Sequence, residues 1–328
     1  MPESGDEGET SKRKAFFRRR QGDIQAQMQA TRAELRTQVK SRRAQFDATQ
    51  DRINARTGRN LLFAVTFGLV LGLGMLFSLI FVKDAFILVA AVLVAFAVFE
   101  LAGALRFAGR DVPRVVSLVV AVAVMPITFY FPGRGQLISV IAAIVIVCIW
   151  RAFEGLSVKH KGTRADLFKD FGAAAFIQLY VTFLGSFAVE LAAHPNGQWW
   201  TLAFLVVVVG VDTGAYATGV AWGKHPMAPT ISPKKTWEGF AGSAATALIA
   251  GVLLSIFMLD EPWWFGLIFG GVLIVTATVG DLAESLIKRD LGIKDISSWL
   301  PGHGGFLDRL DSTLPSAAAA YALYLMFT

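Results

Sequence analysis

Cysteine is almost absent from this chain of 328 residues, which has only Cys148, inside an apolar stretch. An intramolecular disulfide is therefore excluded, and we expect Cys148 to be a small core or lipid-facing residue. The chain begins with polar residues, so no secretory signal peptide is predicted there. Charged residues are rare over long runs, and the composition is 54% hydrophobic with a mean hydropathy of +0.53. This composition excludes an ordinary soluble globular protein and predicts an all-α polytopic integral membrane protein.

Long apolar runs account for most of the chain after residue 60, and each is near the roughly 20 residues that a spanning helix needs. Two of them, 115–131 and 263–280, are short for a full span. Tryptophan pairs begin the runs at 199 and 263, as expected where a helix meets the membrane interface. The nine expected transmembrane helices are 61–82, 85–105, 115–131, 137–153, 173–193, 199–222, 239–259, 263–280 and 310–328.

Lysine and arginine are distributed unevenly among the loops. One set of alternate loops carries only Lys83 and Arg134, whereas the first sixty residues and the other loops carry all the rest. The positive-inside rule therefore predicts a cytoplasmic N-terminus, cytoplasmic long basic loops and an outer C-terminus. The net charge of +6 comes largely from the first sixty residues. It indicates cytoplasmic placement or anionic lipid, and no nucleic acid partner is expected.

Two domains are expected, a cytoplasmic basic tail over 1–60 and a transmembrane domain over 61–328. An apolar stripe over 24–53 predicts an amphipathic helix that lies on the membrane surface or forms a short coiled coil. Arg32 and Arg42 interrupt the stripe and weaken the coiled-coil interpretation. A solvated, partly disordered tail and an assembly module remain the alternatives for this segment.

The densest group of ionisable residues lies between the last two apolar runs. If the preceding helix continues through Arg289, then Asp281, Glu284, Ser285 and Lys288 share one helix face. A carboxylate and an ammonium on one face suit a divalent cation beside phosphate oxygens, and Mg²⁺ prefers hard oxygen ligands of this kind. Charge at a membrane boundary is costly, so we interpret the group as a functional site.

A second acidic pair begins the last apolar run. Asp308 and Asp311 are three residues apart, with Arg309 between them. A single Asp at a helix start is often a cap, but two acids exceed what a cap needs. His303 precedes two glycines, and this turn would let the backbone approach a ligand closely. His303 alone fits structural hydrogen bonding as well as function.

Another polar block follows the run 199–222. Asp212 lies within that apolar run and needs a partner, a cation or a proton. The proline-stiffened loop after it brings hydroxyl and ammonium groups that suit phosphate oxygens, from Ser232, Lys234, Lys235 and Thr236. Without a ligand, the same lysines would fit a basic cytoplasmic loop.

Two further acids lie within apolar runs. Glu100 is near the end of its run and is placed to pair with Arg106, and Glu190 is close to His194. We expect structural or interfacial functions for both acids.

The two polar blocks together resemble the phosphatidate cytidylyltransferases, also called CDP-diacylglycerol synthases. Their C-terminal motif is matched by Ser285-x-x-Lys288-Arg289, Lys294-Asp295 and Pro301-x-His303-Gly304-Gly305-x-x-Asp308-Arg309-x-Asp311. Their other polar block is matched by Ser232-Pro233-Lys234-Lys235-Thr236-x-Glu238-Gly239. The resemblance covers roughly residues 60 to 328 and omits the tail. One departure is Val220, where many members carry a basic residue, and it puts one phosphate or headgroup contact in doubt.

The resemblance implies a reaction and its requirements. The chain would transfer a cytidylyl group from CTP to phosphatidate, giving CDP-diacylglycerol and pyrophosphate, in a bacterial-type inner membrane. It would depend on Mg²⁺, with a monovalent cation such as K⁺ near the same carboxylates, and would form a homodimer. The lipid phosphate is largely deprotonated at neutral pH because its second pKa is about 6, so no strong general base is needed.

The motif match and the charges assign the site residues. The expected catalytic residues are Asp281, Asp308, Lys288 and Arg309. The expected metal ligands are Asp281, Asp308, Asp311 and Asp212. The expected substrate-binding residues are Ser232, Lys234, Lys235, Thr236, Glu238, Lys288, Arg289, Lys294 and His303.

Two other functions compete with this interpretation. An ion-coupled secondary transporter would use intramembrane acids such as Asp212, but no inverted repeat is evident and the polar residues gather at one membrane face. A CDP-alcohol phosphotransferase would also bind cytidine nucleotides, but its paired Asp-Gly and Ala-Arg elements on one helix are absent from the sequence.

Overall fold

The computed structural model describes residues 72–157, 160, 163–293, 296–297 and 305–328. All of them belong to one unit of the chain, which is described here by itself. The predicted tail with its amphipathic helix lies outside the described residues, as do Lys294 and His303. The domain division at residue 60 therefore stays a prediction.

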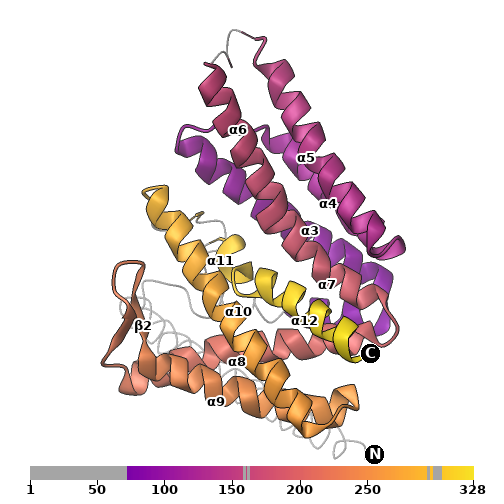
Figure 1. The fold of residues 1–328 in the computed structure, drawn as a ribbon, viewed down its shortest axis with the longest axis vertical. Coiled ribbons are helices and arrows are strands. Elements are labelled where there is room, and N and C mark those ends of the chain that lie inside the picture. The colour runs from indigo at the N-terminus through magenta and orange to yellow at the C-terminus, as the bar shows by residue number, and fades with distance from the viewer. Residues whose placement is uncertain (1–71, 158–159, 161–162, 294–295, 298–304) are drawn as a thin grey trace, which may run out of the picture. The chain divides into compact units, whose positions relative to one another are not determined.

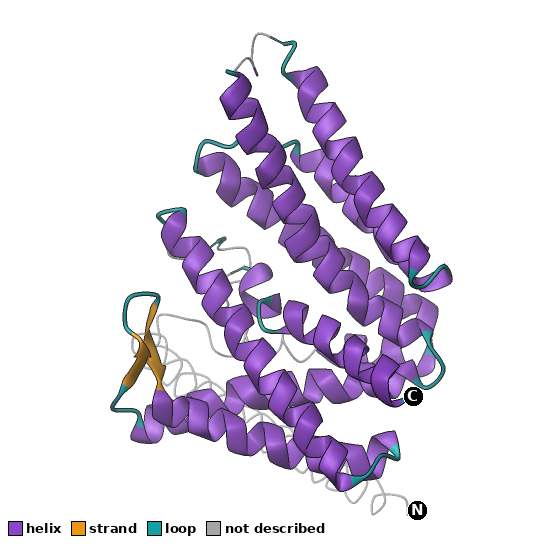
Figure 2. Ribbon diagram, in the orientation of Figure 1, coloured by secondary structure: helices purple, strands orange, loops and turns teal. Residues whose placement is uncertain are grey.

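Helices make up most of the described chain, as Figure 2 shows in purple. The first is the apolar helix Gly72–Phe81. The others are α3 (Lys83–Phe107), α4 (Arg114–Tyr130), α5 (Arg134–Glu154), α6 (Arg164–Ile177), α7 (Leu184–Ala193), α8 (Gly197–Trp222), α9 (Trp237–Leu254), α10 (Trp263–Asp290), α11 (Leu307–Leu310) and α12 (Thr313–Phe327). Two π-helical stretches, η2 (Gln178–Phe183) and η3 (Ser255–Leu259), continue α6 into α7 and extend α9.

Every predicted run from 85–105 onward coincides with a helix, which confirms a helical membrane protein. Six helices are long and apolar enough to cross a membrane, and the described part of the chain adds two shorter apolar helices, Gly72–Phe81 and Arg114–Tyr130. Helix α10 extends beyond the apolar run 263–280 to Asp290, which includes the continuation through Arg289 that the predicted shared face of Asp281, Glu284 and Lys288 requires. Its last turns are polar yet remain helical, since one face of them is covered by other parts of the chain.

A short β-hairpin connects α8 to α9, and it was not predicted. Strands β1 (Pro226–Ala228) and β2 (Ser232–Thr236) pair antiparallel, with Ala228 opposite Ser232 (orange in Figure 2). The Trp237 N–H donates to the His225 carbonyl at 2.9 Å and closes the open end of the hairpin. This pairing fixes the position of β2, which carries the predicted phosphate-binding side chains.

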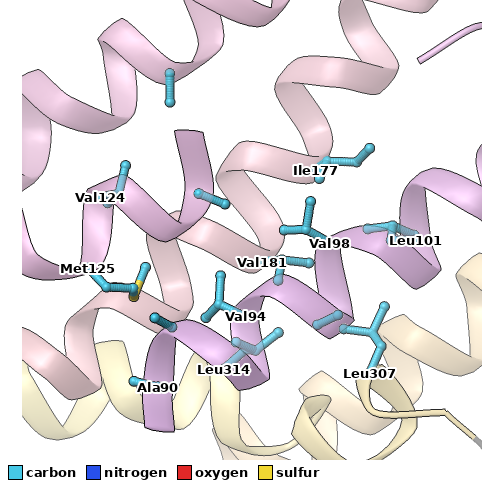
Figure 3. Close-up of a cluster of buried hydrophobic side chains, with 14 of the residues drawn as sticks. Ala90, Val94, Val98, Leu101, Val124, Met125, Ile177, Val181, Leu307 and Leu314 are labelled. Carbon is cyan, nitrogen blue, oxygen red and sulfur yellow. The ribbon is translucent and has the colours of Figure 1, made fainter. Parts of the chain in front are cut away.

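The core that positions the C-terminal segments lies around α3. Val94, Val98 and Leu101 recur along one face of α3 and are buried. Figure 3 shows them beside Leu307 of α11 and Leu314 of α12, with side chains from α4 and from the α6–η2 helix around them. Residues distant in sequence thus share one cluster, and it holds α11 against α3.

Glu100 also ties the C-terminal segment to α3, and its predicted pairing with Arg106 was wrong. Its carboxylate accepts the Leu307 N–H at 3.0 Å and the Ser297 hydroxyl, while Arg106 lies 4.0 Å from Asp111. The Glu100 side chain reaches these donors because Gly305, Phe306 and the start of α11 fold back over it.

Glu190 has the structural function that was expected. It accepts the Gly133 N–H at 2.5 Å and the Tyr321 hydroxyl at 2.9 Å, so one buried acid joins the α4–α5 turn, α7 and α12. The His194 ring contacts the backbone carbonyl of Glu190 instead of its carboxylate.

Helices α9 and α10 pack with their backbones close together. Substitution of a glycine between them therefore tests this packing. A Cβ at Gly270 would collide with the Ala247 carbonyl, whereas a Cβ at Gly271 would meet nothing within 4 Å. Gly270→Ala should therefore destabilise the protein by roughly 1–3 kcal/mol through overpacking. Gly271→Ala, the matched control, should leave stability unchanged or slightly higher because alanine favours helix. Equal melting temperatures of the two variants in detergent would contradict this packing.

Candidate active site

The predicted ionisable residues meet in one cavity of about 610 Å³. It lies where the end of α8, the hairpin, the start of α9, the second half of α10 and α11 come together (Figure 1). Eight of its lining residues are ionisable, four acids and four bases: Asp212, Asp281, Asp308, Asp311, Lys234, Lys235, Lys288 and Arg309. All four predicted catalytic residues and all four predicted metal ligands are among them.

The second half of α10 forms one wall of the cavity. Because α10 is helical to Asp290, Asp281, Glu284 and Lys288 lie on one face, as predicted. The Lys288 ammonium forms ion pairs with the Glu284 carboxylate, one turn earlier, and with Asp308 of α11, at 3.2 Å. Glu284 is 1% exposed, so this lysine is held between two acids, one of them completely buried.

Asp308 is held in its charged form by several donors. Burial alone would raise its pKa, but the hydrogen bond from the Gly305 N–H and the charge of the Lys288 ammonium outweigh burial and lower the pKa of Asp308. The Gly305 N–H lies 2.7 Å from the carboxylate. Asp308 is therefore a fixed negative charge in the wall of the cavity at neutral pH.

The hairpin contributes the opposite wall. Lys235 of β2 forms an ion pair with Asp281 of α10, and the Arg289 side chain donates to the Ile231 carbonyl at 3.3 Å. Thr236 lines the cavity and also caps α9, because its hydroxyl accepts the Gly239 N–H at 3.1 Å. The loop lysines are thus brought to the acids of α10 by hairpin pairing and by a helix cap.

Asp212 and Asp311 complete the acidic side of the cavity. Asp311 is 9% exposed, and its carboxylate accepts the Ser312 N–H at 2.6 Å. The carboxylates of Asp281 and Asp212 are close enough to repel it. Three acids from α8, α10 and the α11–α12 turn therefore interact electrostatically, and a nearby cation would stabilise their charged forms.

Three of the predicted substrate-binding residues that the structure describes do not line the cavity. Glu238 accepts the backbone N–H groups of Lys224 and His225 at 3.1 and 3.2 Å and contacts the His225 ring at 2.6 Å. Ser232 begins β2, and Arg289 holds the hairpin turn. All three support the hairpin in this structure, and their contact with substrate stays a prediction.

The sequence placed Glu284 on the correct helix face, but Glu284 was not predicted to be a catalytic, substrate-binding or metal-ligating residue. Its signal was the spacing of four residues to Lys288, an ion-pair spacing that is common on exposed helices. Only the fold shows that this pair is buried. The apolar wall of the cavity, formed in part by Tyr216, Met227 and Phe240, carried no motif signal.

The donor set of the cavity suits a hard divalent cation and phosphate oxygens. In the described residues, no group of three or more His, Cys, Asp or Glu side chains is close enough to hold a metal ion. One or two aspartates with phosphate oxygens would hold Mg²⁺, which commonly binds in that way. Lysine and arginine beside them can neutralise phosphate groups.

Comparisons with known proteins agree with this chemistry. Residues 63–327 match the model of the cytidylyltransferase family. The phosphatidate cytidylyltransferase of Mycobacterium tuberculosis H37Rv is 39% identical over 272 residues, which are 81% of this chain and 83% of the relative. The protein of the same name from Mycobacterium leprae is 36% identical over 276 residues, covering 82% of this chain and 88% of the relative. The chain belongs to the cytidylyltransferase family.

Proposed function

We infer that this chain is an enzyme that transfers a cytidylyl group from CTP to phosphatidate, giving CDP-diacylglycerol and pyrophosphate. The observation that carries the inference is the single cavity of four acids and four bases, in a chain whose relatives are named phosphatidate cytidylyltransferases. The ion-coupled transporter is not favoured, because the same comparisons point to a nucleotidyltransferase.

Charge is the main obstacle that the residues must overcome. A lipid phosphate, largely dianionic at neutral pH, has to approach the α-phosphorus of a triphosphate. We assign Lys234, Lys235, Lys288 and Arg309 to the phosphate groups, since all four bases line the cavity. Their fixed positions lower the barrier by positioning and by electrostatic stabilisation, without a general base.

Lys288 is the base whose position the structure defines best. It lies between Glu284 and Asp308, so its ammonium is fixed where α10 meets α11. A preorganised cation of this kind stabilises charge that develops on a phosphate oxygen without reorganisation during the reaction. Glu284 is then a positioning residue, since it acts through Lys288.

We propose that Asp281 and Asp308 hold Mg²⁺ together with phosphate oxygens, and that Asp212 and Asp311 orient the bases around the ion. When bound, Mg²⁺ would neutralise phosphate charge and orient the triphosphate. The mutual repulsion of the Asp212, Asp281 and Asp311 carboxylates supports a cation there. The monovalent cation and the homodimer rest on the family resemblance alone and stay predictions.

We also propose a topology of nine spans in a bacterial inner membrane, with the cavity on the cytoplasmic side. The six long apolar helices and the bacterial relatives support a multi-pass membrane protein. The distribution of lysine and arginine supports the orientation. A cytoplasmic cavity would face the cellular CTP, and the acyl chains of the lipid would remain in the bilayer.

Cysteine labelling tests the orientation. Lys224→Cys in a Cys148→Ala background places one thiol at an exposed position next to the hairpin. A membrane-impermeant maleimide should label it in inside-out vesicles and not in intact spheroplasts. The reverse pattern would contradict the proposed orientation.

Pyrophosphate release tests the reaction. Purified protein should release pyrophosphate from CTP only when phosphatidate and Mg²⁺ are both present, and a chelator should abolish release.

Asp308→Asn should lower kcat by roughly 10²-fold or more, as loss of a transition-state contact does. The control Asp290→Asn changes an exposed acid at the end of α10 and should stay within about twofold of wild type. Release without lipid, or full activity of Asp308→Asn, would overturn the assignment.

A double substitution separates the catalytic from the structural contribution of Lys288. Lys288→Met should lower activity by roughly 10²-fold, and it should also destabilise the fold, since it leaves buried Glu284 without its cation. Adding Glu284→Gln removes that unpaired acid, so the double variant should regain thermal stability and remain inactive. Recovery of activity together with stability would show that Lys288 stabilises the fold and makes no catalytic contribution.

A further inference from the structure

A second cavity lies outside the site described above and shares no lining residue with it. Its volume is about 470 Å³, within the range of small-molecule sites. It is formed by the last turns of α3, the first residue of α4 and the described residues 293 and 296–297, with Phe99, Phe107, Arg114, Ile293 and Ile296 in its walls. Its lining is largely apolar, with one arginine and one glutamate.

Arg114 is held in this cavity by its surroundings. Its guanidinium lies over the Phe99 ring, 5.1 Å from the centroid, an arrangement that fixes the planar group. It also lies against Gly103, where a Cβ would come within 2.5 Å of Nη2 and would displace the guanidinium. The guanidinium therefore has a defined position.

Arg114 has no acid to neutralise it within the described part of the chain. The ion pairs there do not include it, and its buried Nε has no hydrogen-bond partner. The acid in the same cavity, Glu100, is occupied by the Leu307 N–H and the Ser297 hydroxyl. A guanidinium with unused donors in an apolar cavity suits an oxyanion that binds with two oxygens, such as a phosphate group.

The rim of the cavity suits an apolar chain. Phe107, which lines the cavity, is 80% exposed, and Val115, which follows Arg114 and lies outside the lining, is 71% exposed. Phe107 belongs to α3 and Val115 to α4, and these two helices pack against each other (Figure 1). A ligand with its phosphate on Arg114 would therefore have apolar surface beside it for acyl chains.

We propose that this cavity binds the phosphate group of an anionic glycerophospholipid, at a site separate from the one that holds CTP. Two lipids share that chemistry, the phosphatidate that is consumed and the bulk anionic phospholipid of the membrane. One hydrogen bond links the walls of the two cavities. Glu100, which lines this cavity, accepts the N–H of Leu307, the residue before Asp308. Binding itself does not depend on the proposed reaction, whereas an effect of this lipid on turnover rests on it.

Lipid binding without CTP tests the proposal. Full-length protein in phosphatidylcholine nanodiscs would be titrated with phosphatidate or with phosphatidylglycerol, and bound lipid would be counted by native mass spectrometry. Arg114→Met should weaken the binding of the anionic lipid about tenfold or more, as loss of a charge-assisted contact does. Arg110→Met, a nearby arginine outside the cavity lining, is the control and should bind as wild type does.

Each outcome has a defined meaning. Loss of both lipids in Arg114→Met indicates a general anionic-phospholipid site, and loss of phosphatidate alone indicates a substrate-binding site. If Arg114→Met fails to fold, Phe107→Glu places a repelling charge on the exposed rim and should give the same loss. Unchanged binding in a folded variant overturns the proposal. Asp308→Asn should still bind the lipid, so failure of the proposed reaction and failure of this site can be distinguished.

Discussion

A carboxylate in a low-dielectric region remains charged only if a cation compensates it, and this constraint governs the site. Here the compensation comes from other segments of the chain. Lys288 of α10 forms ion pairs with Asp308 of α11 and with buried Glu284, and Lys235 of the hairpin forms an ion pair with Asp281. Two of these three ion pairs join different elements, so the charges assigned to substrate binding also determine how the hairpin, α10 and α11 assemble.

In the proposed reaction, the same pairs would let one cavity accept two polyanions. Lys235 and Lys288 are paired with acids, which keeps buried charge in balance. Phosphate groups and Mg²⁺ can then exchange partners with them, so that lysines contact phosphate oxygens and aspartates contact the metal. Binding of a nucleotide triphosphate and a lipid phosphate would thus rearrange existing charges and would leave none of them uncompensated.

Much of the fold and of the charged site could be predicted from the sequence. Apolar runs of spanning length gave the helices from α3 onward, because periodicity and length carry that information. The acids Asp281, Asp308 and Asp311 were recognised because charge next to an apolar run is rare. The hairpin was missed, since prolines and short strands in a loop give no strong pattern. Glu100 was given the wrong partner, because Leu307 is more than 200 positions away and only the fold brings them together.

Transfer of label from CTP to lipid tests the central claim most directly. The protein would be given phosphatidate, Mg²⁺ and CTP labelled either at the α-phosphorus or at the γ-phosphorus. If the lipid phosphate attacks the α-phosphorus, label from the α position should enter the organic phase with the lipid, and label from the γ position should stay in water as pyrophosphate. Label from the γ position in the lipid, or from neither position, would contradict a cytidylyl transfer.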